Sequence, residues 1–474
     1  MPPNELHTRL AKLPLERLAK FVANLADDIP ELRERVEALA LSGDPKSLAK
    51  LLRGRLMRVK RGRRFIHYRE SRAFAAELSG WLADVEEGLL EADSEAALGL
   101  LEEFIRLDGR VLGRADDSDG LIGDGFRLAC GMWQLAASKL PASPDWVKRT
   151  RDLHADNDYG VRDALLDEAA LRLSELELRR LAKMYQEKAA PQPARKGRGT
   201  GKPGDVEVSV HTDDFERDWE ASTAATAMGQ VAVVLQDAAL YEKSLRIRSP
   251  QLNTLQAADV AKKYVEFGPV EMAVPLLEFA LGDNRNLGQL DVLAEAYEKL
   301  GDSAKLRETR RRLFEQSVSS AAFAEYLACL PKAERAKAKK SAIAKVVATG
   351  DPFRVAQFLL DIGDPKSAAR IVEKASGGLM DVFYAHLLAL AKDLERGGQL
   401  LPATLCYRAL SEQILQEARS KAYGHASRYV AKLDALHRQL DGYGDFPDHA
   451  AYMAGLRERH GRKHAFWKRV EGAG

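Results

Sequence analysis

Apolar residues recur every three or four positions between Ala257 and Leu313, and glycines interrupt this pattern at regular intervals. A period of three to four residues places apolar side chains on one face of an α-helix. The breaks at Gly268 and Gly301 lie 33 residues apart, and a tyrosine precedes each break by one turn. The pattern therefore predicts two consecutive helical hairpins.

The two hairpins share the order of their small and large apolar residues. The first carries Val260, Ala261, Tyr264, Ala273, Leu277 and Ala280, and the second carries Leu290, Leu293, Ala294, Tyr297 and Leu306. This spacing resembles the tetratricopeptide repeat, although Leu306 stands where a small residue is expected. Two further units have breaks at Gly363 and Gly398, and residues 317–350 form a degenerate unit.

Helical periodicity also covers most of the chain before residue 189, and strand signals are almost absent. A short alternation at Val206, Val208 and Val210 adds one strand at most. The tripeptide Gly-Asp-Pro, which suits a helix end followed by a helix start, occurs three times. We predict an all-α fold, an irregular tetratricopeptide-like solenoid of helical hairpins in two helical parts.

Residues 189–205 are rich in proline, glycine, lysine and arginine, a composition that cannot bury a core. We interpret this segment as a flexible basic linker. The predicted parts are an N-terminal helical domain (1–188), the linker (189–205), the repeats (206–416) and C-terminal capping helices (417–474).

The strongest local concentration of charge is the segment 53–69, which contains eight basic residues and no acidic residue. Phe65, His67 and Tyr68 lie among them. The basic residues are Arg53, Arg55, Arg58, Lys60, Arg61, Arg63, Arg64 and Arg69. Arginine binds phosphate and aromatic rings stack on bases, so one interpretation is a nucleic-acid-binding segment. We favour the other, a solvated basic loop between helices that is neutralised by the acidic residues 84–103.

Three carboxylates, Asp116, Asp117 and Asp119, precede Gly120. Such a cluster is compatible with calcium binding or with a general acid and base. In the EF-hand register, however, Ala115 and Phe126 occupy two ligand positions. A cap for the helix that follows explains the same residues, and we favour that interpretation.

The last predicted helix runs to Trp467 and places one set of residues on a single face. That set is His449, Tyr452, Leu456, His460, Lys463 and Trp467, with Phe466 beside it. His460 and His464 are four residues apart, which is a spacing that zinc ligands use. A third ligand is missing, and Arg462 and Lys463 repel a cation. We predict packing rather than a metal site.

These motifs also carry a resemblance to a poorly characterised bacterial all-helical family, related to segments that accompany SWIM zinc fingers. The motif residues are Asp116, Asp117, Asp119, Gly120, His449, Tyr452, His460, Arg462, Lys463, Phe466 and Trp467, together with residues 418–436. The chain lacks the Cys-x-Cys and Cys-x-His ligands of the finger itself. The resemblance implies helical architecture and bacterial origin, and it assigns no role to these residues.

Composition narrows the classes of function. The 72 basic and 70 acidic residues nearly cancel, so no global field attracts nucleic acid or an anionic membrane. Three cysteines far apart favour a reducing compartment, and no apolar run is long enough for a membrane span. We therefore expect a cytoplasmic protein without a membrane partner.

Motifs of common enzyme classes are missing: a phosphate-binding glycine loop, a nucleophile elbow and a kinase-like set. We predict a non-enzymatic scaffold that binds a protein or peptide partner on its concave face and needs no cofactor. Two alternatives stay open. One is nucleic-acid binding by residues 53–69, with help from residues 195–202 and from the basic C-terminal helix, and the other is a metal-dependent enzyme.

Overall fold

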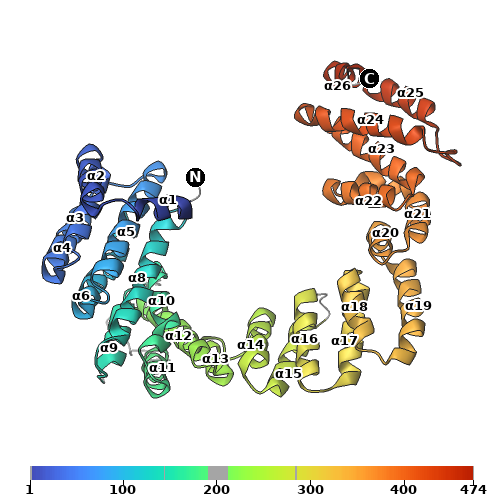
Figure 1. The fold of residues 1–474 in the computed structure, drawn as a ribbon. Helices are drawn as coiled ribbons and strands as arrows, with labels where there is room; N and C mark the ends of the chain where they lie inside the picture. The colour runs from blue at the N-terminus through green and yellow to red at the C-terminus, as the bar shows by residue number, and fades with distance from the viewer. Residues whose placement is uncertain (1–2, 144, 191–211, 283–285, 473–474) are drawn as a thin grey trace, which may run out of the picture. The chain divides into compact units, whose positions relative to one another are not determined.

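The computed structural model describes residues 3–143, 145–190, 212–282 and 286–472, which form helices joined by short turns (Figure 1). One isolated parallel bridge, between Ile66 and Ala115, is the only β-type pairing in these ranges. The prediction of an all-α helical solenoid is confirmed. The predicted alternation at residues 206–210 lies outside the described residues.

Packing divides the chain into two compact units, Met1–Leu276 and Leu277–Gly474. The α-helices of the first unit are α1 (Pro3–Leu10), α2 (Leu15–Asp28), α3 (Pro30–Ala40), α4 (Pro45–Arg61), α5 (Tyr68–Gly88), α6 (Ser94–Ile105), α7 (Asp108–Leu112), α8 (Leu121–Ser138), α9 (Asp145–His154), α10 (Ala164–Asp167), α11 (Glu175–Ala189), α12 (Thr212–Val234), α13 (Ala238–Arg248) and α14 (Thr254–Phe267). Its 3-10 turns are η1 (Val161–Asp163), η2 (Ala169–Leu171) and η3 (Val270–Met272).

Helix α15 (Ala273–Leu281) contains the division between the units. The second unit continues with α16 (Leu287–Lys299), α17 (Ser303–Ser317), α18 (Ser320–Ala328), α19 (Lys332–Thr349), α20 (Pro352–Asp361), α21 (Pro365–Lys374), η4 (Ser376–Asp381), α22 (Tyr384–Arg396), α23 (Leu400–Gln416), η5 (Ser420–Ala422), α24 (Tyr423–His437), α25 (His449–His460) and α26 (His464–Glu471).

Local sequence sets the helix ends at the three Gly-Asp-Pro tripeptides. In each, the aspartate caps the next helix and the proline occupies its first turn. The Asp44 carboxylate accepts from the Ser47 amide at 3.2 Å, and that of Asp364 accepts from the Ser367 amide at 3.1 Å. Gly363 has φ 82°, a left-handed conformation that glycine adopts without strain. The predicted punctuation between helices is confirmed at these positions.

Aromatic rings form the centre of each core. In the first unit Trp81, Phe104 and Phe126 join α5, α6 and α8, with ring centroids 5.0 and 4.8 Å apart. In the second unit Phe314 lies 4.8 Å from the ring of Phe323 and 5.2 Å from that of Phe358. Burying such a ring stabilises a fold by about 1.5–3 kcal/mol, so these contacts fix helices that cannot hide their apolar faces alone.

The hairpin positions predicted from sequence are mostly buried, including Ala261, Ala294, Ala356 and Ala391, whereas Leu306 is half-buried. Repeated tyrosines add a hydrogen bond that the sequence did not reveal. Tyr264 donates to Glu242 on the preceding helix at 2.6 Å, and Tyr297 donates to Glu278 at 3.0 Å. Neighbouring helices are thus joined by the same polar contact in consecutive hairpins.

The described structure says little of the predicted domain boundaries. Apart from Ala189 and Ala190, the predicted linker 189–205 lies outside the described residues. The helices on its two sides, α11 and α12, pack against each other within the first unit. The four-part division stays a prediction.

We predict that ionisation of Tyr297 lowers the stability of the fold at alkaline pH. Burial, followed by the hydrogen bond to Glu278, raises the pKa of Tyr297 to about 12, against about 10 in an unfolded chain. Its contribution is therefore present below about pH 10 and is lost as the pH rises through about 12. In urea unfolding at neutral pH, the free energy of unfolding of Tyr297→Phe should be about 1 kcal/mol lower than that of the wild type, because the hydrogen bond to Glu278 is lost.

Between about pH 10 and 12 the Tyr297→Phe variant should lose less stability than the wild type, because phenylalanine does not ionise. Tyr159→Phe serves as the control, since Tyr159 is 47% exposed. Equal pH dependence of the Tyr297→Phe variant and the wild type would contradict the assignment.

Candidate functional site

The prediction that the basic segment is a loop is wrong for residues 53–61, which belong to α4. Four of its eight cations form ion pairs within the first unit. Arg55 is 7% exposed, and its Nη1 donates to Asp84 Oδ2 at 2.8 Å. The other pairs are Arg53 with Glu103 at 3.0 Å, Arg58 with Glu34, and Arg64 with Glu70. They attach α4 and the loop after it to α3, α5 and α6. Two of the acidic partners, Asp84 and Glu103, belong to the acidic residues 84–103 that the sequence indicated.

The other half of the segment faces solvent. Lys60, Arg61, Arg63 and Arg69 are exposed, and none makes a hydrogen bond or ion pair with another residue that the structure describes. Between these cations, Phe65 is 47% exposed and Tyr68 is 51% exposed. We name residues 60–69 the basic knuckle. It presents free cations and aromatic rings on one short stretch of chain.

Hydrogen bonds to residues 114–116 hold the basic knuckle in place. The Ile66 amide donates to the Arg114 carbonyl at 2.8 Å, and the Asp116 amide donates to the Ile66 carbonyl at 2.9 Å. Arg114 Nη1 donates to the Arg64 carbonyl at 2.8 Å, while its guanidinium lies over Phe74. These contacts fix the backbone conformation of the loop between α4 and α5, and the exposed side chains project from that fixed backbone.

The acidic loop before α8 acts as a cap. Asp117 accepts from the amides of Ile122 at 2.9 Å and Gly123 at 2.8 Å. Asp116 accepts from the Ser118 hydroxyl, and Asp119 accepts from the Tyr68 hydroxyl and raises the pKa of that phenol. Gly120 takes the left-handed conformation, with φ 74°. Asp117 thus caps the first turn of α8, whereas Asp116 and Asp119 accept from Ser118 and Tyr68 and do not cap that helix.

A cleft of about 750 Å³ lies beside the basic knuckle, between α3, α4 and α5. Its walls include Phe74, Trp81 and Phe104, an apolar lining of the kind that small-molecule sites have. Among its charged lining residues, Arg55 and Asp84 pair with one another. Glu77 also lines the cleft, and burial raises the pKa of its carboxyl group. The cleft therefore offers an apolar wall beside a carboxyl group whose pKa is raised.

The C-terminal motif forms two helices, so the prediction of one helix running to Trp467 is wrong. Helix α25 ends at His460, and α26 begins at His464. The Lys463 amide donates to the His460 carbonyl at 3.0 Å and closes a turn around Gly461. A Cβ at Gly461 would lie 2.7 Å from the Arg457 carbonyl oxygen, so glycine fits this turn. Trp467 then folds back to donate its indole N–H to the His460 carbonyl at 3.0 Å.

His460 serves packing within the second unit. It is 8% exposed, and its Nε2 lies 2.9 Å from Glu412 Oε2 on α23. His464 is exposed on the next helix. In the described part of the chain, no three His, Cys, Asp or Glu side chains form a group that could hold a metal ion.

Arg408 on α23 anchors the loop before α25. Its guanidinium lies between the rings of Tyr443 at 5.1 Å and Tyr452 at 4.5 Å. It also donates to the carbonyls of Pro447 at 2.7 Å and Asp448 at 3.2 Å. Burial lowers the pKa of Arg408, and the two tyrosine faces compensate part of the lost hydration.

The remaining motif residues are placed around the same helices. His449 lies 2.7 Å from Asp434 and stacks on His437, while Phe466 packs against Tyr423. Arg462 is exposed, and Lys463 is half-buried. The buried members of the motif attach α25 and α26 to α23 and α24.

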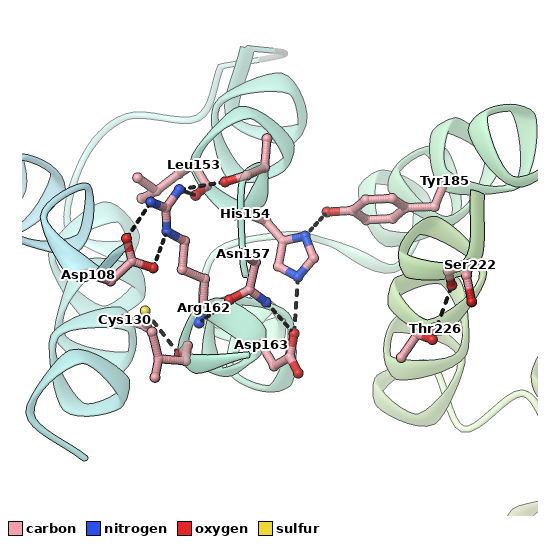
Figure 2. Close-up of polar contacts among 12 residues, drawn as sticks. Asp108, Cys130, Leu153, His154, Asn157, Arg162, Asp163, Tyr185, Ser222 and Thr226 are labelled. Carbon is pink, nitrogen blue, oxygen red and sulfur yellow. Dashed lines mark hydrogen bonds and ion pairs between the residues drawn. The ribbon is translucent and has the colours of Figure 1, made fainter. Parts of the chain in front are cut away.

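Sequence reasoning missed a buried polar network in the first unit, which Figure 2 shows. Arg162 is 5% exposed, and its Nε and Nη2 donate to the Asp108 carboxylate at 2.8 and 2.6 Å. Arg162 also donates to the Leu153 carbonyl at 3.0 Å. These contacts tie η1 to α7 and α9. In sequence Asp108 lies 54 residues from Arg162, so no local pattern could have paired them.

His154 forms the second half of this network. Its Nδ1 lies 2.9 Å from the Tyr185 hydroxyl and its Nε2 lies 3.3 Å from Asp163 (Figure 2). A Tyr-His-Asp order resembles a catalytic relay. Burial, however, raises the pKa of Tyr185 well above its ordinary value, and the residue is 5% exposed. The neutral, enclosed phenol joins α9 to α11 and is not poised for attack.

Asp163 is the charged end of this network. Burial raises the pKa of Asp163, but hydrogen bonds from His154, Gln230 and Asn157 outweigh it, and the pKa is lowered. The carboxylate is thus held ionised where η1, α9 and α12 meet. A charged group at this position fixes the helices around it.

We predict that Arg162→Met lowers the free energy of unfolding by about 3–5 kcal/mol, because it leaves the buried carboxylate of Asp108 without its partner. The change should be measured by urea unfolding followed by circular dichroism. Arg162→Met combined with Asp108→Leu should cost less than the sum of the two single changes.

Arg151→Met is the matched control, since Arg151 pairs with its exposed neighbour Asp152 and should contribute less than about 1 kcal/mol. Wild-type stability of Arg162→Met would show that the buried pair is not needed by the fold.

Fold and site together define an all-α protein of stacked helical hairpins whose motif residues mostly serve packing. Residues 5–469 match the model of DUF6880, a family of unknown function, and the chain belongs to that family. No curated protein matches the sequence. None of the described helices is both long and apolar enough to cross a membrane.

Proposed function

We propose that this protein is a scaffold that binds a protein or peptide partner through its helical hairpins. The observation that supports it is helix α19, where every side chain from Lys332 to Ser341 is exposed except that of the half-buried Ala338. The exposed half of α19 contributes little to the core of the second unit. Binding of a partner to this surface would account for the exposure.

The proposal includes three finer points. The hairpins are tetratricopeptide-like, supported by buried alanines at matching positions and by the repeated tyrosine–glutamate bond. The C-terminal motif keeps its resemblance to segments that accompany SWIM zinc fingers. A cytoplasmic location is supported by Cys130, Cys329 and Cys406, which are all free thiols.

The scaffold proposal predicts a stoichiometric protein partner. The full chain, immobilised and exposed to nuclease-treated lysate of the native host, should retain one or a few proteins identifiable by mass spectrometry. Because the interface is formed by folded helices, the purified partner should bind the native chain by calorimetry and fail to bind the heat-unfolded chain. Equal retention by native and unfolded chains, or retention that nuclease abolishes, would contradict a protein scaffold.

A second candidate function is binding of single-stranded nucleic acid by the basic knuckle. The observation that favours it is the set of free cations at Lys60, Arg61, Arg63 and Arg69 around exposed rings. Arginine pairs with phosphate and aromatic rings stack on bases, which is the usual combination in single-strand binders. The predicted help from residues 195–202 lies outside the described residues.

We predict that Arg61→Ala, Arg63→Ala and Arg69→Ala each weaken binding of labelled oligothymidine, measured by fluorescence polarisation. Each lost phosphate contact should lower the slope of log affinity against log salt by about 0.7. Phe65→Ala should cost about 1–3 kcal/mol if its ring stacks on a base. The exposed Arg370 on α21 gives the control Arg370→Ala.

The contrasting variant is Arg64→Ala. Arg64 already pairs with Glu70, so its loss should weaken oligothymidine binding less than the loss of Arg61 or Arg63. If all of these variants bind as the wild type does, the basic knuckle does not bind nucleic acid.

A further inference from the structure

Helix α19 is used by the fold mainly through its C-terminal half. Ala342 is 6% exposed and Val346 is 1% exposed, and they pack the helix onto its neighbours. In the N-terminal half, from Lys332 to Ser341, Ala338 alone is half-buried and every other side chain is exposed. Two to three turns of this helix therefore offer a free surface.

The free surface has a definite pattern. One stripe runs along the helix at intervals of three or four residues, on the side away from Ala342 and Val346. Its members are Ala333, Ala336, Lys337, Lys340, Ala344 and Val347. All are exposed, and Val347 is 44% exposed. Small apolar residues thus occur together with lysines on a face whose side chains are all exposed.

The charge on α19 is predominantly positive. The helix carries six basic residues and one acidic residue, Glu334. Arg335 is used by the fold, because it donates to the carbonyls of Leu330 and Ala328, and Lys345 pairs with Glu315 at 2.7 Å. The remaining four are Lys332, Lys337, Lys339 and Lys340. None of these four makes a hydrogen bond or ion pair with another described residue.

We propose that this stripe of α19 binds an acidic amphipathic helix of a protein partner. The inference rests on the proposed scaffold function and names the partner's chemistry. Alanines let a second helix approach closely, and Val347 offers an apolar contact to it. Lys337 and Lys340 lie within the stripe, where glutamates or aspartates flanking the partner's apolar face reach them.

The composition of α19 favours protein over nucleic acid as the occupant. The free cations are lysines, whereas bidentate phosphate recognition favours arginine. No aromatic residue occurs in α19, so the stripe has nothing on which a base stacks. The basic knuckle, with its arginines and exposed rings, has the opposite composition.

The test measures binding of a fluorescein-labelled helical peptide of leucine, alanine and glutamate, with glutamates along both edges of its leucine face. The full chain should bind this peptide, and the double variant Lys337→Glu/Lys340→Glu should bind it at least about tenfold more weakly. Ala344→Gln, which adds bulk without charge, should also weaken binding, because close helix approach is lost. Circular dichroism establishes that each variant keeps its helix content.

The matched control is Lys366→Glu/Lys374→Glu, which reverses two exposed lysines on α21 and should leave peptide binding unchanged. Absence of peptide binding, wild-type affinity of the α19 variant, an equal loss in the control, or tighter binding of oligothymidine to α19 would overturn the inference. A native partner that binds the α19 charge-reversal variant as tightly as the wild type leaves the scaffold function standing and removes only this assignment.

Discussion

The fold depends on a simple constraint, which is that an amphipathic helix cannot remove its apolar face from water alone. Most helices of this protein are too short to be stable by themselves and gain stability by packing against neighbouring helices. Phe314, Phe323 and Phe358 illustrate it, because α17, α18 and α20 each supply one ring to a single cluster. The helical hairpin is the smallest arrangement that satisfies this constraint, and its repetition accounts for both units.

The basic residues discussed above fall into two groups, buried arginines that stabilise the fold and exposed cations that do not. Arg55, Arg162 and Arg408 are buried, and each is surrounded by carboxylates, carbonyls or aromatic faces that replace lost hydration. A buried guanidinium without such partners would be costly, so these residues fix the geometry around them. The second group consists of exposed cations that have no such partners among the described residues, namely Lys60, Arg61, Arg63 and Arg69 in the basic knuckle and Lys332, Lys337, Lys339 and Lys340 on α19. These cations are the ones available to a binding partner.

The C-terminal motif shows how a distinctive pattern can serve architecture. Histidines and tryptophan at helical spacing are often a sign of chemistry, yet His460 lies against Glu412 and receives the indole of Trp467 on its carbonyl. Tyr452 covers one face of Arg408. The same residues that make the motif recognisable thus attach the last two helices to the preceding ones.

The sequence by itself determined the helices, the capped Gly-Asp-Pro boundaries and the small residues buried in the hairpins, because these depend on neighbours within a few positions. It also gave the basic segment, but only tertiary structure separated the paired Arg55 from the free Arg61. The bond between Asp108 and Arg162, and the turn at Gly461 that parts His460 from His464, likewise came from the fold. Contacts between residues distant along the chain follow from the packing of whole helices, and local periodicity carries no record of that packing.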